Sequence, residues 1–132
     1  MIVITPNIRY QSIAFGYSSK LKDLYRQGKL EGLKSFSGEE LKHPSIDHIK
    51  PKSKGGKNIL GNYVLTNCKE NSLRGDKNID YYIENNEQGM LDYIKWFETH
   101  KVPGFDCIGY IRKVINTINN VSEKFIIINM IK

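Results

Sequence analysis

An aspartate and a histidine stand side by side at Asp47 and His48, inside a short stretch of alternating apolar and polar residues. A histidine side chain titrates near neutral pH, so His48 can take a proton from a water molecule. Adjacent residues of a strand point to opposite faces, so Asp47 and His48 cannot do the same job by the same route. Three more polar residues with side chains suited to binding follow along the chain: Asn62, Asn71 and Arg74.

The segment from Ile46 to Lys77 resembles the HNH endonuclease family, whose nuclease core is a ββα-metal motif. The matching residues are Asp47-His48, Pro51, Gly55-Gly56, Asn62, Asn71 and Arg74. Asn62 follows His48 by 14 residues and Asn71 follows Asn62 by 9, which is similar to the spacing in small bacterial and phage HNH proteins. The resemblance covers roughly a quarter of the chain and lacks the two CxxC pairs that bind a structural zinc in many members.

The resemblance implies a role for each of these residues. His48 would be the general base that activates water for attack on a phosphodiester, and Asp47 and Asn71 would hold one divalent metal. One carboxylate and one amide oxygen form an oxygen-only ligand set, which suits Mg²⁺ or Mn²⁺ better than zinc. Asn62 would belong to the catalytic set by holding the long loop so that His48 is aimed correctly. Arg74 would join that set by gripping a phosphate with its planar guanidinium.

Each residue also has a plain structural interpretation. Asp47 could pair with a loop lysine, His48 could be an ordinary surface or core histidine, and Asn62 could cap a turn. Asn71 could be an exposed helix residue, and Arg74 could be a cation near a helix C-terminus, where it favours the helix dipole. The functional interpretation depends on all of them standing together in the register of the family.

Local patterns predict the elements that would position the site. They predict a helix over about 20–32, a short turn of helix at 37–40, strands at 45–49 and 62–66, and a helix over about 68–75 capped by Thr66 or Asn67. From Asp80 onward the pattern is helical, with a break at Pro103-Gly104 and a second helix capped by Asp106. Its apolar stripe would be Ile108, Ile111, Ile115 and Ile118. Short strands are expected at 2–5 and 125–128.

The composition fits one soluble globular domain. The 132 residues are 39% hydrophobic and 26% charged, and no apolar stretch reaches the about 20 residues of a membrane helix. Two cysteines exclude a disulfide-dense scaffold or a four-cysteine zinc site, and both are expected to be free, mostly buried thiols. The net charge is +6, which favours a polyanionic partner. Residues 49–69 hold five lysines and no Asp, Glu or Arg.

The local patterns predict an α+β fold in one domain, with helices at about 18–43 and 79–120. The resemblance implies that the segment between them, about 44–78, is a ββα-metal (HNH) core. The expected function is metal-dependent hydrolysis of DNA in the cytoplasm, with Mg²⁺ or Mn²⁺ as cofactor and no membrane contact. Four loop lysines would line the approach of the nucleic acid: Lys50, Lys52, Lys54 and Lys57. Three alternatives stay open, namely a binding module with an inactive HNH scaffold, an RNA-directed nuclease and a toxin. A homodimer or a partner protein also stays open.

Overall fold

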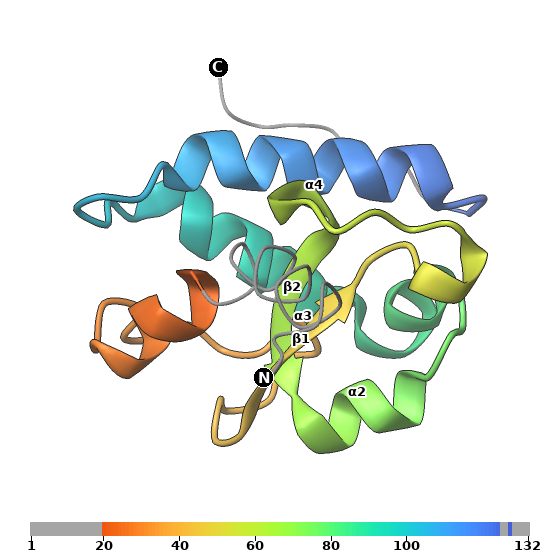
Figure 1. Cartoon of the computed structure of the whole chain (residues 1–132), viewed down its shortest axis with the longest axis horizontal. Coiled ribbons are helices and arrows are strands. Elements are labelled where there is room, and N and C mark those ends of the chain that lie inside the picture. The colour runs from red at the N-terminus through yellow and green to blue at the C-terminus, as the bar shows by residue number, and fades with distance from the viewer. Residues whose placement is uncertain (1–19, 125–126, 128–132) are drawn as a thin grey trace, which may run out of the picture.

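The computed structural model describes residues 20–124 and residue 127, and it has an α+β architecture. Residues 20–26 are helical and precede the named elements. These are β1 (Pro44–His48), the 3-10 turns η1 (Lys52–Lys54) and η2 (Leu60–Asn62), β2 (Tyr63–Asn67), α2 (Cys68–Arg74), α3 (Asp80–Thr99) and α4 (Cys107–Val121). In Figure 1 the two strands lie between α4 and α2, and α3 lies behind them.

The two strands form an antiparallel sheet with α2 packed against both of them. The register pairs Pro44 with Asn67 at one end and His48 with Tyr63 at the other. β2 runs straight into α2, because Asn67 forms a capping box with Glu70 at the helix N-terminus. The predicted strands and this helix are therefore confirmed within a residue or two, and Asn67 is the cap. The long connection between the strands, residues 49–62, is called the lysine loop below.

Two long helices supply most of the remaining core. Tyr93 of α3 and Tyr110 of α4 share a hydrogen bond of 2.9 Å between their hydroxyls. Tyr110 donates to the Tyr63 carbonyl of β2 at 2.6 Å, and Tyr93 accepts from the Leu65 amide at 3.1 Å. The residues of this network are all buried, and the hydrogen bonds satisfy their polar atoms inside the core. The network fixes both helices against β2, which is the strand that leads into α2.

Several predicted features are wrong. The first helix ends at residue 26 rather than at 32, and residues 37–40 form turns beside a bridge between Lys34 and Glu40 instead of a helical turn. On α4, which Asp106 caps as predicted, Ile108 is 41% exposed and does not belong to the buried stripe. Cys107 is buried but Cys68 is exposed.

The two terminal strands lie mostly outside the described residues. The expected strand at 2–5 is not covered, and of the strand expected at 125–128 only Ile127 is described, as a buried residue without strand assignment.

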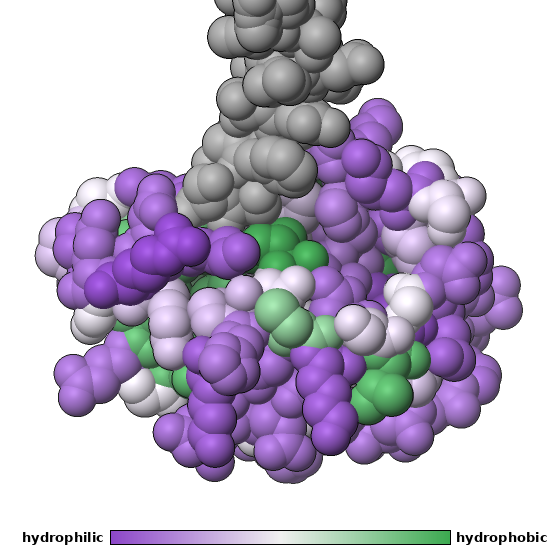
Figure 2. Space-filling view, turned by 60° about the horizontal axis from the view of Figure 1, so that its bottom comes forward, coloured by the Kyte–Doolittle hydropathy of each residue, from purple (hydrophilic) through white to green (hydrophobic). Residues whose placement is uncertain are grey.

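The surface around α2 is mostly hydrophilic. Figure 2 shows this side with apolar residues in small, separate patches. The large hydrophobic side chains exposed among the described residues are Ile59, Leu73 and Ile108, which belong to three different segments. No helix in the described ranges is long and apolar enough to cross a membrane.

The cap of α2 makes a first prediction about stability. The Glu70 carboxylate accepts hydrogen bonds from Ser35 and Thr66 at 2.9 Å and from Ser37. Burial raises the pKa of Glu70, but these hydrogen bonds outweigh it and the net pKa lies below the ordinary value of 4.5. A lowered pKa means that the stabilisation is present at neutral pH and is lost as pH falls through and below 4.5. Glu70→Gln should therefore cost about 1–2 kcal/mol near pH 7.

Urea denaturation at neutral and acidic pH measures this effect. The gap between wild type and Glu70→Gln should close in acid, because the wild-type carboxylate is then protonated. The exposed Glu87 of α3 provides the matched control, since Glu87→Gln should leave the midpoint unchanged at both pH values. A gap that stayed constant with pH would assign the effect to packing and not to charge.

Candidate functional site

His48 is held from the lysine loop by Asn58. The His48 Nε2 atom lies 2.8 Å from the Asn58 Oδ1 atom, and the His48 ring packs edge-on against Tyr63 at a centroid distance of 5.0 Å. An amide oxygen only accepts hydrogen bonds, so Nε2 carries the proton and Nδ1 of the neutral ring keeps a lone pair. Nδ1 has no hydrogen bond to the described part of the chain. The arrangement leaves His48 half-buried, oriented and able to accept a proton.

Asn62 ties the two halves of the lysine loop together. Its Oδ1 atom accepts from the Lys50 amide at 2.8 Å, and its Nδ2 atom donates to the Lys50 and Lys57 carbonyls at 3.1 and 2.9 Å. Asn62 is 2% exposed, so these bonds are shielded from water. These three hydrogen bonds are the contacts expected of a residue that holds the loop. Whether Asn62 thereby sets the orientation of His48 stays a prediction.

The two predicted glycines allow the loop its tight turn. Gly55 has φ +91°, a left-handed backbone that side chains disfavour. A Cβ atom added to Gly56 would clash with the Lys50 carbonyl, so only glycine lets the loop fold back here. The loop that carries Asn58 is thus fixed by Asn62 and by this glycine pair.

Asp47 points away from His48 into a buried network. One carboxylate oxygen of Asp47 lies 3.0 Å from Arg74 Nη1, and the other accepts from the Tyr82 hydroxyl at 2.5 Å. The residue is only 5% exposed. Burial raises the pKa of the Asp47 carboxyl above its ordinary value, and Arg74 and Tyr82 oppose that rise. The opposite orientation of Asp47 and His48 is the one that strand geometry predicts.

Arg74 does not hold the position predicted for it. Its side chain is fully buried, and its guanidinium donates to the carbonyls of His48, Ile49 and Lys77 at 2.6, 2.7 and 2.7 Å. With the ion pair to Asp47, these bonds engage all three nitrogen atoms of the guanidinium. The predicted phosphate contact of Arg74, and with it the catalytic role, is therefore wrong. Arg74 instead fixes the end of β1, the strand that carries His48.

Asn71 lies on α2 against the backbone of β1. Its Nδ2 atom donates to the Ser45 hydroxyl at 2.9 Å and to the Ile46 carbonyl at 3.1 Å. Its Oδ1 atom accepts no hydrogen bond from the described residues. The amide is thus held by its nitrogen while its oxygen stays available as a ligand.

The donor set for a metal consists of oxygen atoms alone. Asn71 offers an amide oxygen that has no partner among the described residues, and each Asp47 oxygen accepts one partner although a carboxylate oxygen can accept two. The two residues fit a hard cation of the Mg²⁺ class, which would share Asp47 with Arg74 and Tyr82. No cluster of three or more His, Cys, Asp or Glu residues suited to a metal occurs in the described ranges.

The four loop lysines predicted to meet nucleic acid are all exposed. Lys54 donates to Asn78 at 3.0 Å, which links the loop to the segment before α3. None of the four forms an ion pair within residues 20–124. Their charges are therefore not neutralised by neighbouring carboxylates.

Two residues of the site were not predicted. Asn58 holds His48, and the available signal was an amide ten residues past the histidine in the same turn-rich loop. Tyr82 holds Asp47 from α3, 35 residues along the chain, and a helical tyrosine gave no sequence signal for that contact. Both contacts decide how the predicted site residues point.

Comparison with known proteins adds no relationship. Scans against protein-family models, curated proteins and solved structures each gave no match.

Proposed function

We propose that the protein is a metal-dependent endonuclease of the HNH type that hydrolyses DNA phosphodiester bonds, with β1, the lysine loop, β2 and α2 as its ββα-metal core. The observation that carries the proposal is the geometry of His48. An oriented imidazole with an available Nδ1 atom stands at the end of a strand, beside a loop whose four exposed lysines form no ion pair with the described residues. A general base next to a polyanion-attracting surface suits phosphodiester hydrolysis.

In this mechanism His48 Nδ1 removes a proton from a water molecule while the water oxygen attacks phosphorus and the bond to the leaving oxygen breaks. The Asn58 Oδ1 atom holds the resulting imidazolium, because it accepts a hydrogen bond from the Nε2–H group of His48. Asn62 keeps the loop, and with it Asn58, in place. Arg74 keeps the backbone of His48 in place by its bond to the His48 carbonyl.

Asp47 and Asn71 would hold the divalent cation through their oxygen atoms. When bound, this cation supplies charge stabilisation for the phosphate and for the departing oxygen. The oxygen-only donor set favours Mg²⁺ or Mn²⁺. Because Asp47 is shared with Arg74 and Tyr82, we expect the cation to bind weakly.

The decisive test uses supercoiled plasmid with Mg²⁺, with Mn²⁺ and with EDTA. Nicked or linear product should appear with either metal and disappear with EDTA. A thermal unfolding series with the same metals gives a readout that does not depend on activity. Mn²⁺ should raise the melting temperature of the wild type, and Asn71→Ala should remove that rise. Ser72→Ala, at an exposed position beside Asn71, is the control and should keep it.

Two results would contradict the proposal: cleavage that persists in EDTA, or purified protein that never cuts DNA with either metal.

A second candidate is a nucleic-acid-binding module with an inactive scaffold. The observation that favours it is the burial of Asp47, whose two oxygens already have protein partners. Such a module would bind DNA through the loop lysines without cutting it. It would also show no stabilisation by Mg²⁺ or Mn²⁺, so the thermal series separates the two candidates.

A further inference from the structure

The structure brings together two segments that carry no acidic residue. Residues 49–69 contain no Asp or Glu, and neither does α4, residues Cys107–Val121. α4 packs directly on η2 at the end of the lysine loop. A Cβ atom added to Gly61 would lie only 2.8 Å from Lys113 Cβ, so glycine permits this close approach. The two acid-free segments therefore form one continuous surface.

A cleft of about 150 Å³ lies between the lysine loop and α4. Its lining residues include Lys50, Lys57 and Ile59 from the loop and Thr117, Asn120 and Val121 from α4, and no acidic residue. Lys113 stands one helical turn before Thr117 on the same face of α4. The cleft thus has two cations and the exposed Asn120 amide on its lining, which are groups that bind phosphate oxygens. The Thr117 hydroxyl already donates to the Lys113 carbonyl at 2.9 Å.

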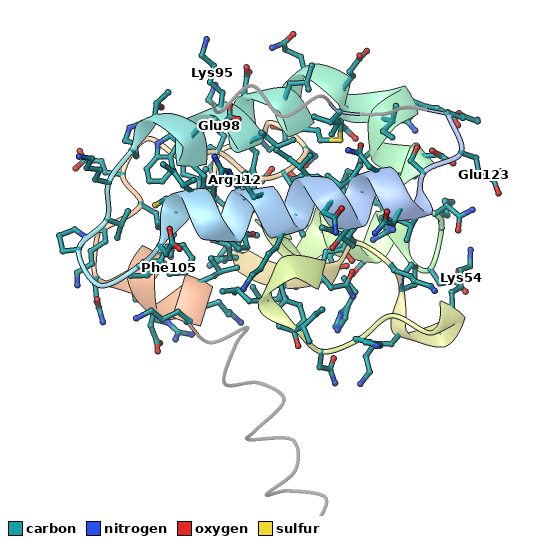
Figure 3. All side chains as sticks on the ribbon, turned by 90° about the horizontal axis from the view of Figure 1, so that it is seen from above. Lys54, Lys95, Glu98, Phe105, Arg112 and Glu123 are labelled. Atoms are coloured by element: carbon teal, nitrogen blue, oxygen red, sulfur yellow. The ribbon has the colours of Figure 1, made fainter. Side chains whose placement is uncertain are left out.

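These cations have no carboxylate partner in the described ranges. The ion pairs there join Arg26 to Asp23, Arg74 to Asp47 and Lys124 to Glu84. Arg112, the residue before Lys113 on α4, lies on a different side of the helix. Figure 3 shows Arg112 on the side of α4 that faces α3 and Glu98, while Lys54 of the lysine loop lies across the helix from it. Lys113 therefore lies on the side of α4 that meets the lysine loop, whereas Arg112 lies on the side that faces α3.

We propose that this cleft is a phosphate-binding subsite for the backbone of duplex DNA, so that α4 extends the nucleic-acid surface beyond the predicted loop. The inference rests on the proposed function for the identity of the partner. Asn58, which holds His48, is the residue between Lys57 and Ile59 in the sequence, and both of these line the cleft. A DNA backbone that passes His48 would therefore continue into the cleft. Lys113 would contact a phosphate, with the Asn120 amide as a further donor.

The test is fluorescence anisotropy of a labelled DNA duplex, titrated with the full chain in EDTA over a range of salt concentrations. EDTA separates binding from cleavage. Each phosphate contact contributes about 0.9 to the slope of log K against log salt. Lys113→Gln should lower that slope by about 0.9 and weaken binding several-fold at low salt. Arg112→Gln removes the same charge from the next residue and should leave the slope unchanged.

Asn120→Asp is the second variant, because it places an acid in the cleft without removing a cation. It should weaken binding at least as much as Lys113→Gln. Thermal unfolding of each variant checks that the fold is intact. Equal losses for Lys113→Gln and Arg112→Gln would overturn the subsite, as would wild-type protein that binds no duplex. Binding that depends on Lys113 without metal-dependent cleavage would retain the subsite and reject the nuclease.

Discussion

Arg74→Met is expected to lower the free energy of unfolding by about 3–5 kcal/mol. The substitution leaves the Asp47 carboxylate buried without its ion-pair partner, at a position that is 5% exposed. It also removes donors from the carbonyls of His48, Ile49 and Lys77. Unsatisfied buried charges and acceptors are among the few changes that cost this much. Urea denaturation at neutral pH measures the loss through the midpoint and its slope.

Arg26→Met is the matched control, because Arg26 also pairs with an aspartate but at the surface. The Arg26 and Asp23 side chains are 64% and 54% exposed, so this variant should cost less than about 1 kcal/mol. An Arg74 loss as small as the Arg26 loss would contradict the buried network. The double variant Arg74→Met/Asp47→Leu should recover part of the stability, because no uncompensated charge then remains.

A DNA-contacting arginine would behave differently. Its replacement would weaken DNA binding while leaving the unfolding midpoint near that of the wild type. The buried network predicts the opposite pattern, with a large loss of stability. A conservative Arg74→Lys variant keeps the charge but loses the planar guanidinium that donates to three carbonyls. Its free energy of unfolding should therefore lie between those of the wild type and Arg74→Met.

The part of the fold that could be predicted is the part encoded locally. The alternation around Ile46, the turn-rich loop and the capping pattern at Asn67 and Glu70 each act within a few residues, and β1, β2 and α2 appear where these patterns indicate. The helix predicted over 20–32 ends at residue 26, and a turn follows it. Leu30 and Leu33 are buried there without being helical, since packing against the core needs only burial.

The orientation of the site residues could not be predicted in the same way. A cation near the end of a short helix is typical of an exposed residue, and only the approach of α3 and the end of β1 makes Arg74 a core residue. In the sequence Asn58 likewise looks like any polar residue of a turn. Its contact with His48 depends on the loop folding back at Gly56. In both cases the orientation of the side chain depends on a partner that is distant in sequence or brought close by the loop. Periodicity and capping patterns act within a few residues, so they do not predict such a partner.

His48→Ala gives the second large effect, a loss of about 10²–10⁴-fold in the rate of metal-dependent plasmid cleavage. The substitution removes the only candidate base in the described site whose proton-accepting nitrogen is available. Because His48 is half-buried and its side chain makes one hydrogen bond, with Asn58, and one ring contact, with Tyr63, the fold should survive. His100→Ala is the matched control, since His100 stacks on Trp96 at the end of α3 and should leave the rate unchanged.

The variant also tests the assignment independently of activity. His48→Ala should still bind DNA in EDTA with the wild-type salt slope, because the loop lysines and the α4 cleft remain. Loss of cleavage with retained binding identifies His48 as a residue of the chemical step. Cleavage at the wild-type rate would mean that another group activates the water, and the nuclease would then need a base outside the network of His48, Asn58 and Asn62.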